Sequence, residues 1–122
     1  MRFDLNAPPR WMTHCHCTLC RSAHGAGFVT WIGMLAKDVE IHDAERCLRW
    51  YDSSPGAQRG FCERCGSPLF FRSSRWPSEL HIARAQVHAP LELEPQGHVF
   101  WSRHVDWARP DPADGLPRKD TL

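Results

Sequence analysis

The chain has 122 residues, which is enough for one domain with a modest hydrophobic core. Fifteen Lys and Arg against fourteen Asp and Glu give a formal net charge of +1, so no overall field favours nucleic acid or an anionic membrane as a partner. No signal peptide is recognisable, and no apolar stretch approaches the roughly 18 residues that span a bilayer. We expect a single domain over residues 1–122, located in the cytoplasm, that binds neither nucleic acid nor membrane.

Short runs rich in β-branched and aromatic residues recur along the middle of the chain, a pattern typical of strands. The segments SSPG, CGSP, RWPS and HAP between these runs contain the residues that favour turns. Only the run beginning at residue 79 could instead form a helix, and we interpret it as a strand. The predicted strands cover residues 28–33, 39–42, 47–52, 68–73, 79–87 and 98–102.

The last part of the chain, from about residue 106, is expected to be irregular. Pro110, Pro112, Gly115 and Pro117 interrupt any regular pattern there. With several short strands and little predicted helix, the fold class is mainly β.

Three of the six cysteines, Cys15, Cys17 and Cys20, fall within one short segment. A reducing compartment disfavours structural disulfides, so we interpret closely spaced thiols as metal ligands or catalytic groups. Three protein ligands with an open fourth position are typical of a catalytic zinc site. A redox C-x-x-C motif is the less favoured alternative, because no βαβ pattern surrounds it.

A second pair of thiols, Cys62 and Cys65, is followed directly by Gly66. The two-residue spacing lets both sulfurs reach one ion, and glycine permits the positive φ of the turn called a zinc knuckle. Two thiolates do not complete a tetrahedral site, so this pair needs other ligands. Cys47 stands apart from both groups and is predicted to be a buried, small apolar residue.

Three segments carry a resemblance to a known family: CHCTLCR (15–21), YDSSPGAQRGFCERCGSPLFF (51–71), and GHVFWSRHVDW (97–107) with DGLP (114–117). Together they resemble the glutathione-dependent formaldehyde-activating enzyme (Gfa) family, which includes centromere protein V. The resemblance implies a β-tent of short antiparallel strands stitched by zinc, like that of RabGEF-type zinc proteins. It also implies that Cys15, Cys17 and Cys20 hold a catalytic zinc, whereas Cys62 and Cys65 belong to a structural zinc site.

This sequence departs from the family pattern near its start. The family's structural site also uses an N-terminal C-x-C-G pair, and here no cysteine precedes Cys15. MRFDL resembles the stretch that would follow that pair, so we expect the first strand to be missing. A four-thiolate and a three-thiolate site together need more cysteines than the six that are present.

Three arrangements remain open. The natural start lies upstream of Met1, or two zinc ions bind with water or a histidine such as His14 or His16 filling the gaps. Alternatively, Cys17 and Cys20 combine with Cys62 and Cys65 in one closed structural site, which would remove the catalytic zinc.

The resemblance implies a carbon–sulfur lyase of the S-(hydroxymethyl)glutathione synthase type, which adds a thiol such as glutathione to a small aldehyde such as formaldehyde. Coordination to zinc would deprotonate the thiol, whose sulfur then attacks the carbonyl carbon. Arg21 and Arg59 are candidates for offsetting the negative charge of the zinc site or for binding substrate carboxylates. His98, in the C-terminal resembling segment, is a candidate for lining the substrate pocket.

A non-catalytic zinc module that binds another protein is the alternative function. A sheet that lacks its first strand would present an unpaired edge, and a second copy of the chain could pair with that edge to form a homodimer.

Overall fold

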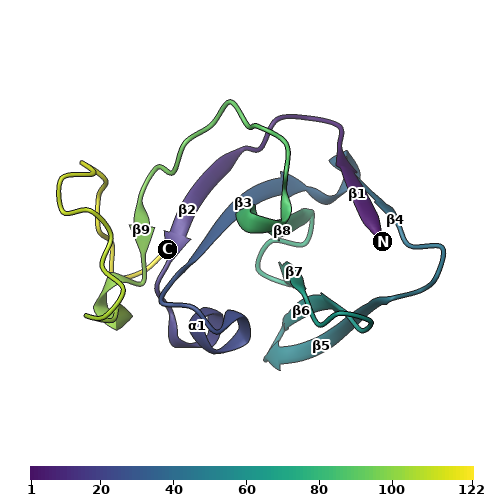
Figure 1. Cartoon of the computed structure of the whole chain (residues 1–122), viewed down its shortest axis with the longest axis horizontal. Helices are drawn as coiled ribbons and strands as arrows, with labels where there is room; N and C mark the ends of the chain where they lie inside the picture. Colours follow the sequence, from purple (N-terminus) through teal and green to yellow (C-terminus); the bar gives the residue numbers. More distant parts are fainter.

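A computed structural model describes all of residues 1–122 and contains one two-stranded sheet, one seven-stranded sheet and a single short α-helix (Figure 1). The small sheet pairs β1 with β4, and the strand order of the large sheet is β5-β6-β7-β8-β3-β2-β9. The elements are β1 (Arg2–Leu5), β2 (Trp11–Cys15), α1 (Thr18–His24), β3 (Val29–Leu35), β4 (Val39–His42), β5 (Leu48–Ser54), β6 (Ala57–Cys62), β7 (Pro68–Ser73), β8 (Glu79–Ala83) and β9 (His98–Val99).

All six predicted strands are present, and two of them end earlier than predicted. The strand expected over residues 79–87 ends at Ala83, because a 3-10 turn over Arg84–Gln86 follows it. The strand expected over residues 98–102 ends at Val99, because Phe100 adopts a left-handed backbone conformation with φ of 55°. The strands β1, β2 and β6 and the helix α1 were not among the predicted elements.

The mainly β class is confirmed, but the large sheet is mixed rather than wholly antiparallel. β9 runs parallel to β2, with His14 opposite His98 and Cys15 opposite Val99. Every other pair of neighbouring strands is antiparallel. This parallel pairing places the C-terminal part of the chain beside the strand that leads into the cysteine cluster.

Strand alternation divides the apolar side chains between the two faces of the large sheet. In β3, Ile32 and Met34 belong to one core, whereas Val29 and Trp31 belong to another. The first core is covered by the small sheet, whose Phe3 and other apolar side chains pack against it. The second core contains Cys15 and Cys20.

The outermost strands of the large sheet are β5 and β9. β9 covers only two residues, and His98 forms an isolated bridge with Arg118 of the C-terminal segment. β5 carries a bulge between Asp52 and Ser54, a feature that limits pairing with another chain. The homodimer remains a prediction.

Residues beyond 106 contain neither helix nor named strand, and they dock through a buried histidine chain. His98 is 0% exposed. Its Nδ1 lies 2.8 Å from Nε2 of His16, and its Nε2 lies 2.8 Å from Oδ2 of Asp114. These contacts tie the tail to β9 and to His16, the residue that directly follows β2. No helix of the structure is long and apolar enough to cross a lipid bilayer.

The docked tail predicts a pH-dependent stability. The backbone N–H of Leu116 and the ring of His98 both donate to the Asp114 carboxylate and lower its pKa from 3.8 to about 2. The ionised form therefore stabilises the fold above the ordinary pKa, and this contribution is lost as the pH falls from about 4 towards 2. Asp114→Asn should be less stable than the native chain in urea unfolding at neutral pH, and the difference should close near pH 2.

The matched control for this experiment is Asp120→Asn, in the same exposed tail. No hydrogen bond or ion pair involves the Asp120 side chain. This variant should unfold like the native chain at every pH. A stability difference for Asp114→Asn that stays constant between pH 7 and pH 2 would contradict the prediction.

Candidate metal centre and its cavity

The cysteine cluster forms where β2 ends and α1 begins. Cys15 is the last residue of β2, Cys17 is the N-cap of α1, and Cys20 lies in the first turn of the helix. The backbone N–H of Cys20 donates to Sγ of Cys17 over 3.3 Å, as the side chain of an N-cap residue normally accepts. The three sulfurs lie within 4.8 Å of one another. Local geometry alone therefore brings the three predicted ligands together.

The thiols share hydrogen bonds that favour one negative charge on the cluster. Hydrogen bonds from the thiols of Cys15 and Cys20 lower the pKa of Cys17. The same contacts, with burial, raise the pKa of Cys15. Without a cation, a second thiolate is thus strongly disfavoured in this space. A divalent metal would remove that penalty, and three thiolate donors with a fourth position free suit zinc.

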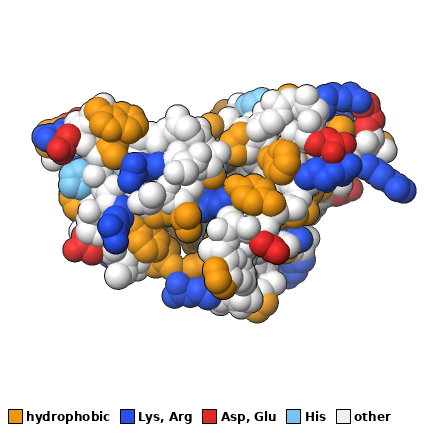
Figure 2. Space-filling model, turned by 90° about the horizontal axis from the view of Figure 1, so that it is seen from below, with side chains coloured by type: hydrophobic (Ala, Val, Ile, Leu, Met, Phe, Trp, Pro, Cys, Tyr) orange, Lys and Arg blue, Asp and Glu red, His pale blue; other side chains and the backbone are white.

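The cluster opens into a cavity of about 460 Å³. Aromatic side chains form much of its wall, and Figure 2 shows apolar side chains gathered around a hollow, with Lys or Arg side chains beside it. The lining includes the aromatic residues Trp11, Trp31, Phe71, Trp76 and Phe100, and the ionisable residues Arg59, Arg75, Glu79 and His81.

Arg59 reaches the cluster from β6 and is only 6% exposed. Its Nη2 donates to Sγ of Cys20 over 3.5 Å, and its guanidinium lies 5.2 Å from the ring centroid of Phe71. Its Nε and Nη1 are buried and have no hydrogen-bond partner. Such unpaired donors are rare in folded proteins. Arg59 is one of the residues that line the cavity, and a guanidinium is suited to bind the carboxylate or alkoxide of a ligand.

Five residues from five neighbouring strands lie opposite one another in a single row, which we call the cavity floor. Arg59 pairs with Phe71, Phe71 with His81, and His81 with Gly33. Gly33 in turn pairs with Trp11. A Cβ at Gly33 would lie 2.1 Å from Cε2 of Trp11, so the indole ring rests directly on the glycine. This close approach lets Trp11 meet the ring of His81 across β3, with 4.7 Å between the ring centroids.

Two of the three residues predicted to bind substrate do not line the cavity. Arg21 turns back to its own segment, where Nε donates to the His16 carbonyl and Nη2 to Oγ1 of Thr18. His98 is fully buried, and both of its ring nitrogens have partners. Substrate binding by Arg21 and His98 stays a prediction that this cavity does not support. Arg59 is the predicted substrate-binding residue that reaches it.

The predicted substitute ligands also point elsewhere. His14 Nδ1 lies 2.7 Å from Oγ1 of Thr30, and His16 Nε2 is engaged by His98. Neither imidazole belongs to the group of ligand atoms formed by Cys15, Cys17 and Cys20.

The knuckle forms a turn of the predicted kind, away from the triplet. Gly66 has φ of 78°, and its N–H donates to the Cys62 carbonyl over 2.7 Å. Cys62 follows Arg59 by three residues in β6 and packs against the first core, on the other face of the sheet. Cys62 and Cys65 do not join the triplet, so the closed site from Cys17, Cys20, Cys62 and Cys65 is not formed. Cys47 is buried, as predicted.

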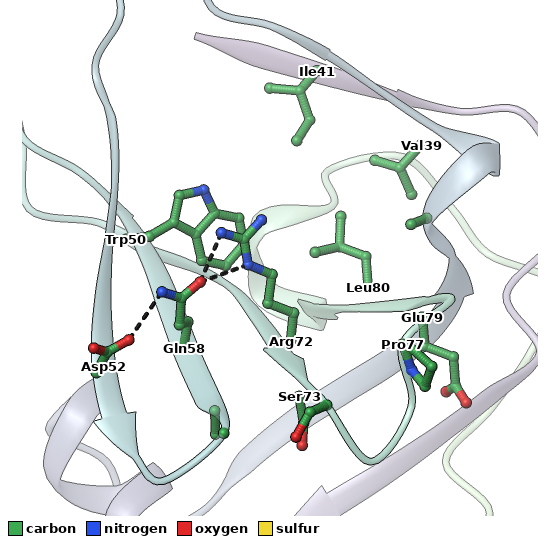
Figure 3. A pocket seen from close by; sticks show the side chains of 14 residues that line it. Val39, Ile41, Trp50, Asp52, Gln58, Arg72, Ser73, Pro77, Glu79 and Leu80 are labelled. Atoms are coloured by element: carbon green, nitrogen blue, oxygen red, sulfur yellow. Dashed lines mark hydrogen bonds between the residues drawn. The ribbon is translucent and has the colours of Figure 1, made fainter.

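A second pocket, of about 590 Å³, lies between the small sheet and β5 to β8 (Figure 3). The Arg72 guanidinium stacks 3.8 Å from the ring centroid of Trp50, and its Nε and Nη2 both donate to Oε1 of Gln58. Gln58 donates in turn to Asp52 over 2.9 Å. No cysteine or histidine lines this pocket. Thiol chemistry is therefore expected in the cavity at the triplet.

The fold and the site define a class: a mainly β protein in which a three-cysteine cluster, able to hold a metal ion, opens into an aromatic cavity. The sequence model of the family described as "Glutathione-dependent formaldehyde-activating enzyme" matches residues 1–103. The chain belongs to this family.

One relative supports the family assignment, and one solved structure shares the fold. The chain is 30% identical over 115 residues to a Halomonas elongata protein named "Putative glutathione-dependent formaldehyde-activating enzyme", covering 88% of this chain and 73% of the relative. It is also similar to the crystal structure of a Rhodobacter sphaeroides protein, with a TM-score of 0.56 and 19% identity, covering 94% of this chain and 86% of that one. The second likeness concerns the fold alone.

Proposed function

We propose that this chain is a zinc-dependent carbon–sulfur lyase that joins a thiol such as glutathione to a small aldehyde such as formaldehyde, and that also catalyses the reverse cleavage. The observation that carries the proposal is the convergence of three thiols at the wall of an aromatic cavity, beside a buried arginine with unpaired donors. Membership of the family makes this chemistry the first to test.

Cys15, Cys17 and Cys20 would hold the zinc. The bound ion would supply a cation that keeps a substrate thiol deprotonated at neutral pH. Zinc would also tie the end of β2 to the start of α1, in keeping with the zinc-stitched β-tent expected for the family. Cys62 and Cys65 remain proposed ligands of a separate zinc, for which the chain must find further ligands.

The protein's own groups have two tasks in this proposal. Arg59 offsets the negative charge of three thiolates and donates to a substrate carboxylate or to the oxygen that becomes an alkoxide. The aromatic walls exclude water from the reacting atoms, which strengthens these electrostatic contacts. In the addition, the sulfur–carbon bond forms, the carbonyl π electrons move to oxygen, and the proton that left the thiol ends on that oxygen. A cytoplasmic location would supply glutathione.

The test is the exchange rate between formaldehyde and its glutathione adduct. Because the adduct also forms without catalyst, we would follow exchange by NMR with ¹³C-formaldehyde, with and without the zinc-loaded chain. The expected result is faster exchange in proportion to protein concentration. Stoichiometric zinc with no acceleration would contradict the enzymatic proposal and favour the non-catalytic zinc module.

A further inference from the structure

Four rings form a continuous surface at the far side of the cavity, which we call the aromatic box: Trp11, Phe71, Trp76 and His81. The ring centroids of Trp11, Phe71 and Trp76 lie 4.7, 5.6 and 5.4 Å from that of His81. The rings come from β2, β7, the β7–β8 turn and β8, so the sheet fixes three of them in place. Exclusion of water from the reacting atoms does not by itself require four neighbouring rings at one end of the cavity.

The box offers uncharged ring faces. Nε2 of His81 lies 3.1 Å from Oε1 of Glu79, and burial lowers the pKa of His81, so its imidazole is neutral at neutral pH. The Glu79 carboxylate is therefore already engaged. One ring already contacts a cation, because the Arg75 guanidinium lies over Trp76, 4.9 Å from its ring centroid. This balance of groups suits a neutral planar ring better than a cationic ligand.

The aromatic box is continuous with the thiol cluster. Trp31 belongs to the same buried core as Cys15 and Cys20, and Phe71 packs against that core. Arg59 spans the interval, since it contacts both Cys20 and the Phe71 ring. His81 lies two strands away from Arg59, which is roughly 10 Å at the usual strand spacing. A ligand that touches both the aromatic box and the surroundings of Arg59 must therefore be longer than formaldehyde.

We propose that the aromatic box is a subsite for the ring of an arylalkyl aldehyde, in which a phenyl-like ring is separated from the carbonyl by a short alkyl chain. This inference rests on the proposed function and specifies its substrate class. The addition is R–SH plus Ar–(CH₂)ₙ–CHO giving R–S–CH(OH)–(CH₂)ₙ–Ar. The sulfur–carbon bond forms, the carbonyl π bond breaks, and the thiol proton ends on the new hydroxyl, so no oxidant or reductant is needed.

The first test compares 3-phenylpropanal with propanal, each with glutathione and the zinc-loaded chain. These aldehydes have similar carbonyls and differ by the ring, so a difference in catalysed exchange reports the ring's contacts. We expect kcat/KM to favour 3-phenylpropanal by roughly 10- to 100-fold, the range expected for burying an aromatic ring. Equal values for the two aldehydes would overturn the inference.

Trp76→Ala is the matched variant, because Trp76 lies in a turn and supplies one wall of the box. It should lower kcat/KM for 3-phenylpropanal much more than kcat/KM for propanal, and so remove most of the preference. The control is Trp107→Ala, which removes the same ring from a position that is 74% exposed and outside the cavity. A preference that survives in Trp76→Ala would overturn the inference.

A binding measurement separates this inference from the proposed function. The unreactive alcohol 3-phenylpropanol should shift the indole N–H resonance of Trp11 in NMR spectra of the zinc-loaded chain, and Trp76→Ala should weaken that binding. If no aldehyde exchanges faster with the protein, the proposed function fails, and Trp76-dependent binding of the alcohol would still support the box as a ring subsite. Absence of alcohol binding would overturn the box itself.

Discussion

Replacing Cys15 with serine is expected to abolish zinc binding at the triplet and, with it, the catalysed exchange of glutathione and formaldehyde. Cys15 is buried at the end of β2 and supplies one of three sulfurs that lie within 4.8 Å of one another. The two thiols that remain, Cys17 and Cys20, are too few protein ligands for a zinc site. Loss of a hydrogen-bond partner of a metal ligand typically weakens binding by 10- to 100-fold, and loss of the ligand itself should exceed about 100-fold.

The measurement is zinc content per chain after dialysis against a weak chelator, together with the exchange rate. Cys65→Ser is the matched control, because Cys65 is exposed and lies outside the triplet. It should leave the triplet's zinc and the exchange rate unchanged, although zinc bound at the knuckle would be lost. If Cys15→Ser keeps both its zinc and its rate, the assignment of the metal centre is wrong.

Gly33→Ala is expected to disrupt the cavity floor and to destabilise the fold by roughly 1–3 kcal/mol. The added Cβ would lie 2.1, 2.2 and 2.6 Å from three atoms of the Trp11 indole, so the ring must leave its place. Its contact with His81 would then be lost. The expected observations are a lower midpoint in urea unfolding and a change in tryptophan fluorescence of the folded protein.

Gly97→Ala provides the control for this prediction. Gly97 is also buried, but an added Cβ there would meet its nearest neighbour, Pro117, at an ordinary 3.5 Å. A second check is the double variant Gly33→Ala with Trp11→Phe. The smaller ring should relieve the clash, so the double variant should lose less stability than the sum of the single changes. Strict additivity would argue against a direct steric cause.

The strands, turns and ligands that could be predicted from this sequence are those that depend on residues close together in the chain. Residues 39–42 and 68–73 form strands as predicted, because β-branched or aromatic residues fill them and turn residues flank them. Gly66 was predicted to adopt positive φ from its place directly after a C-x-x-C pair, and it does. The ligand set Cys15, Cys17 and Cys20 could be proposed from spacing alone, since its geometry depends on one short segment.

The unpredicted parts depend on contacts between distant segments. α1 has only seven residues, and its N-cap is a cysteine, so it lacks the usual Ser, Thr, Asp or Asn signal. β2 is stabilised by pairing with β3 and β9 rather than by strong alternation of its own. The placement of His81 in the cavity floor follows from strand register, which no local pattern encodes. Nothing in the segment WMTHC predicts that the Trp11 ring packs on Gly33.

The local character of the triplet has a consequence for how metal and folding are coupled. Its three thiols fall within a six-residue stretch, whereas the cavity around them is assembled from strands throughout the chain. An unfolded chain therefore retains much of the chelating power of the folded one. By mass action, affinity for the denatured state subtracts from the stabilisation that a ligand provides. Tight metal binding in this protein would thus raise the melting temperature less than the affinity alone suggests, and a nascent chain could acquire its ion before its sheet is complete.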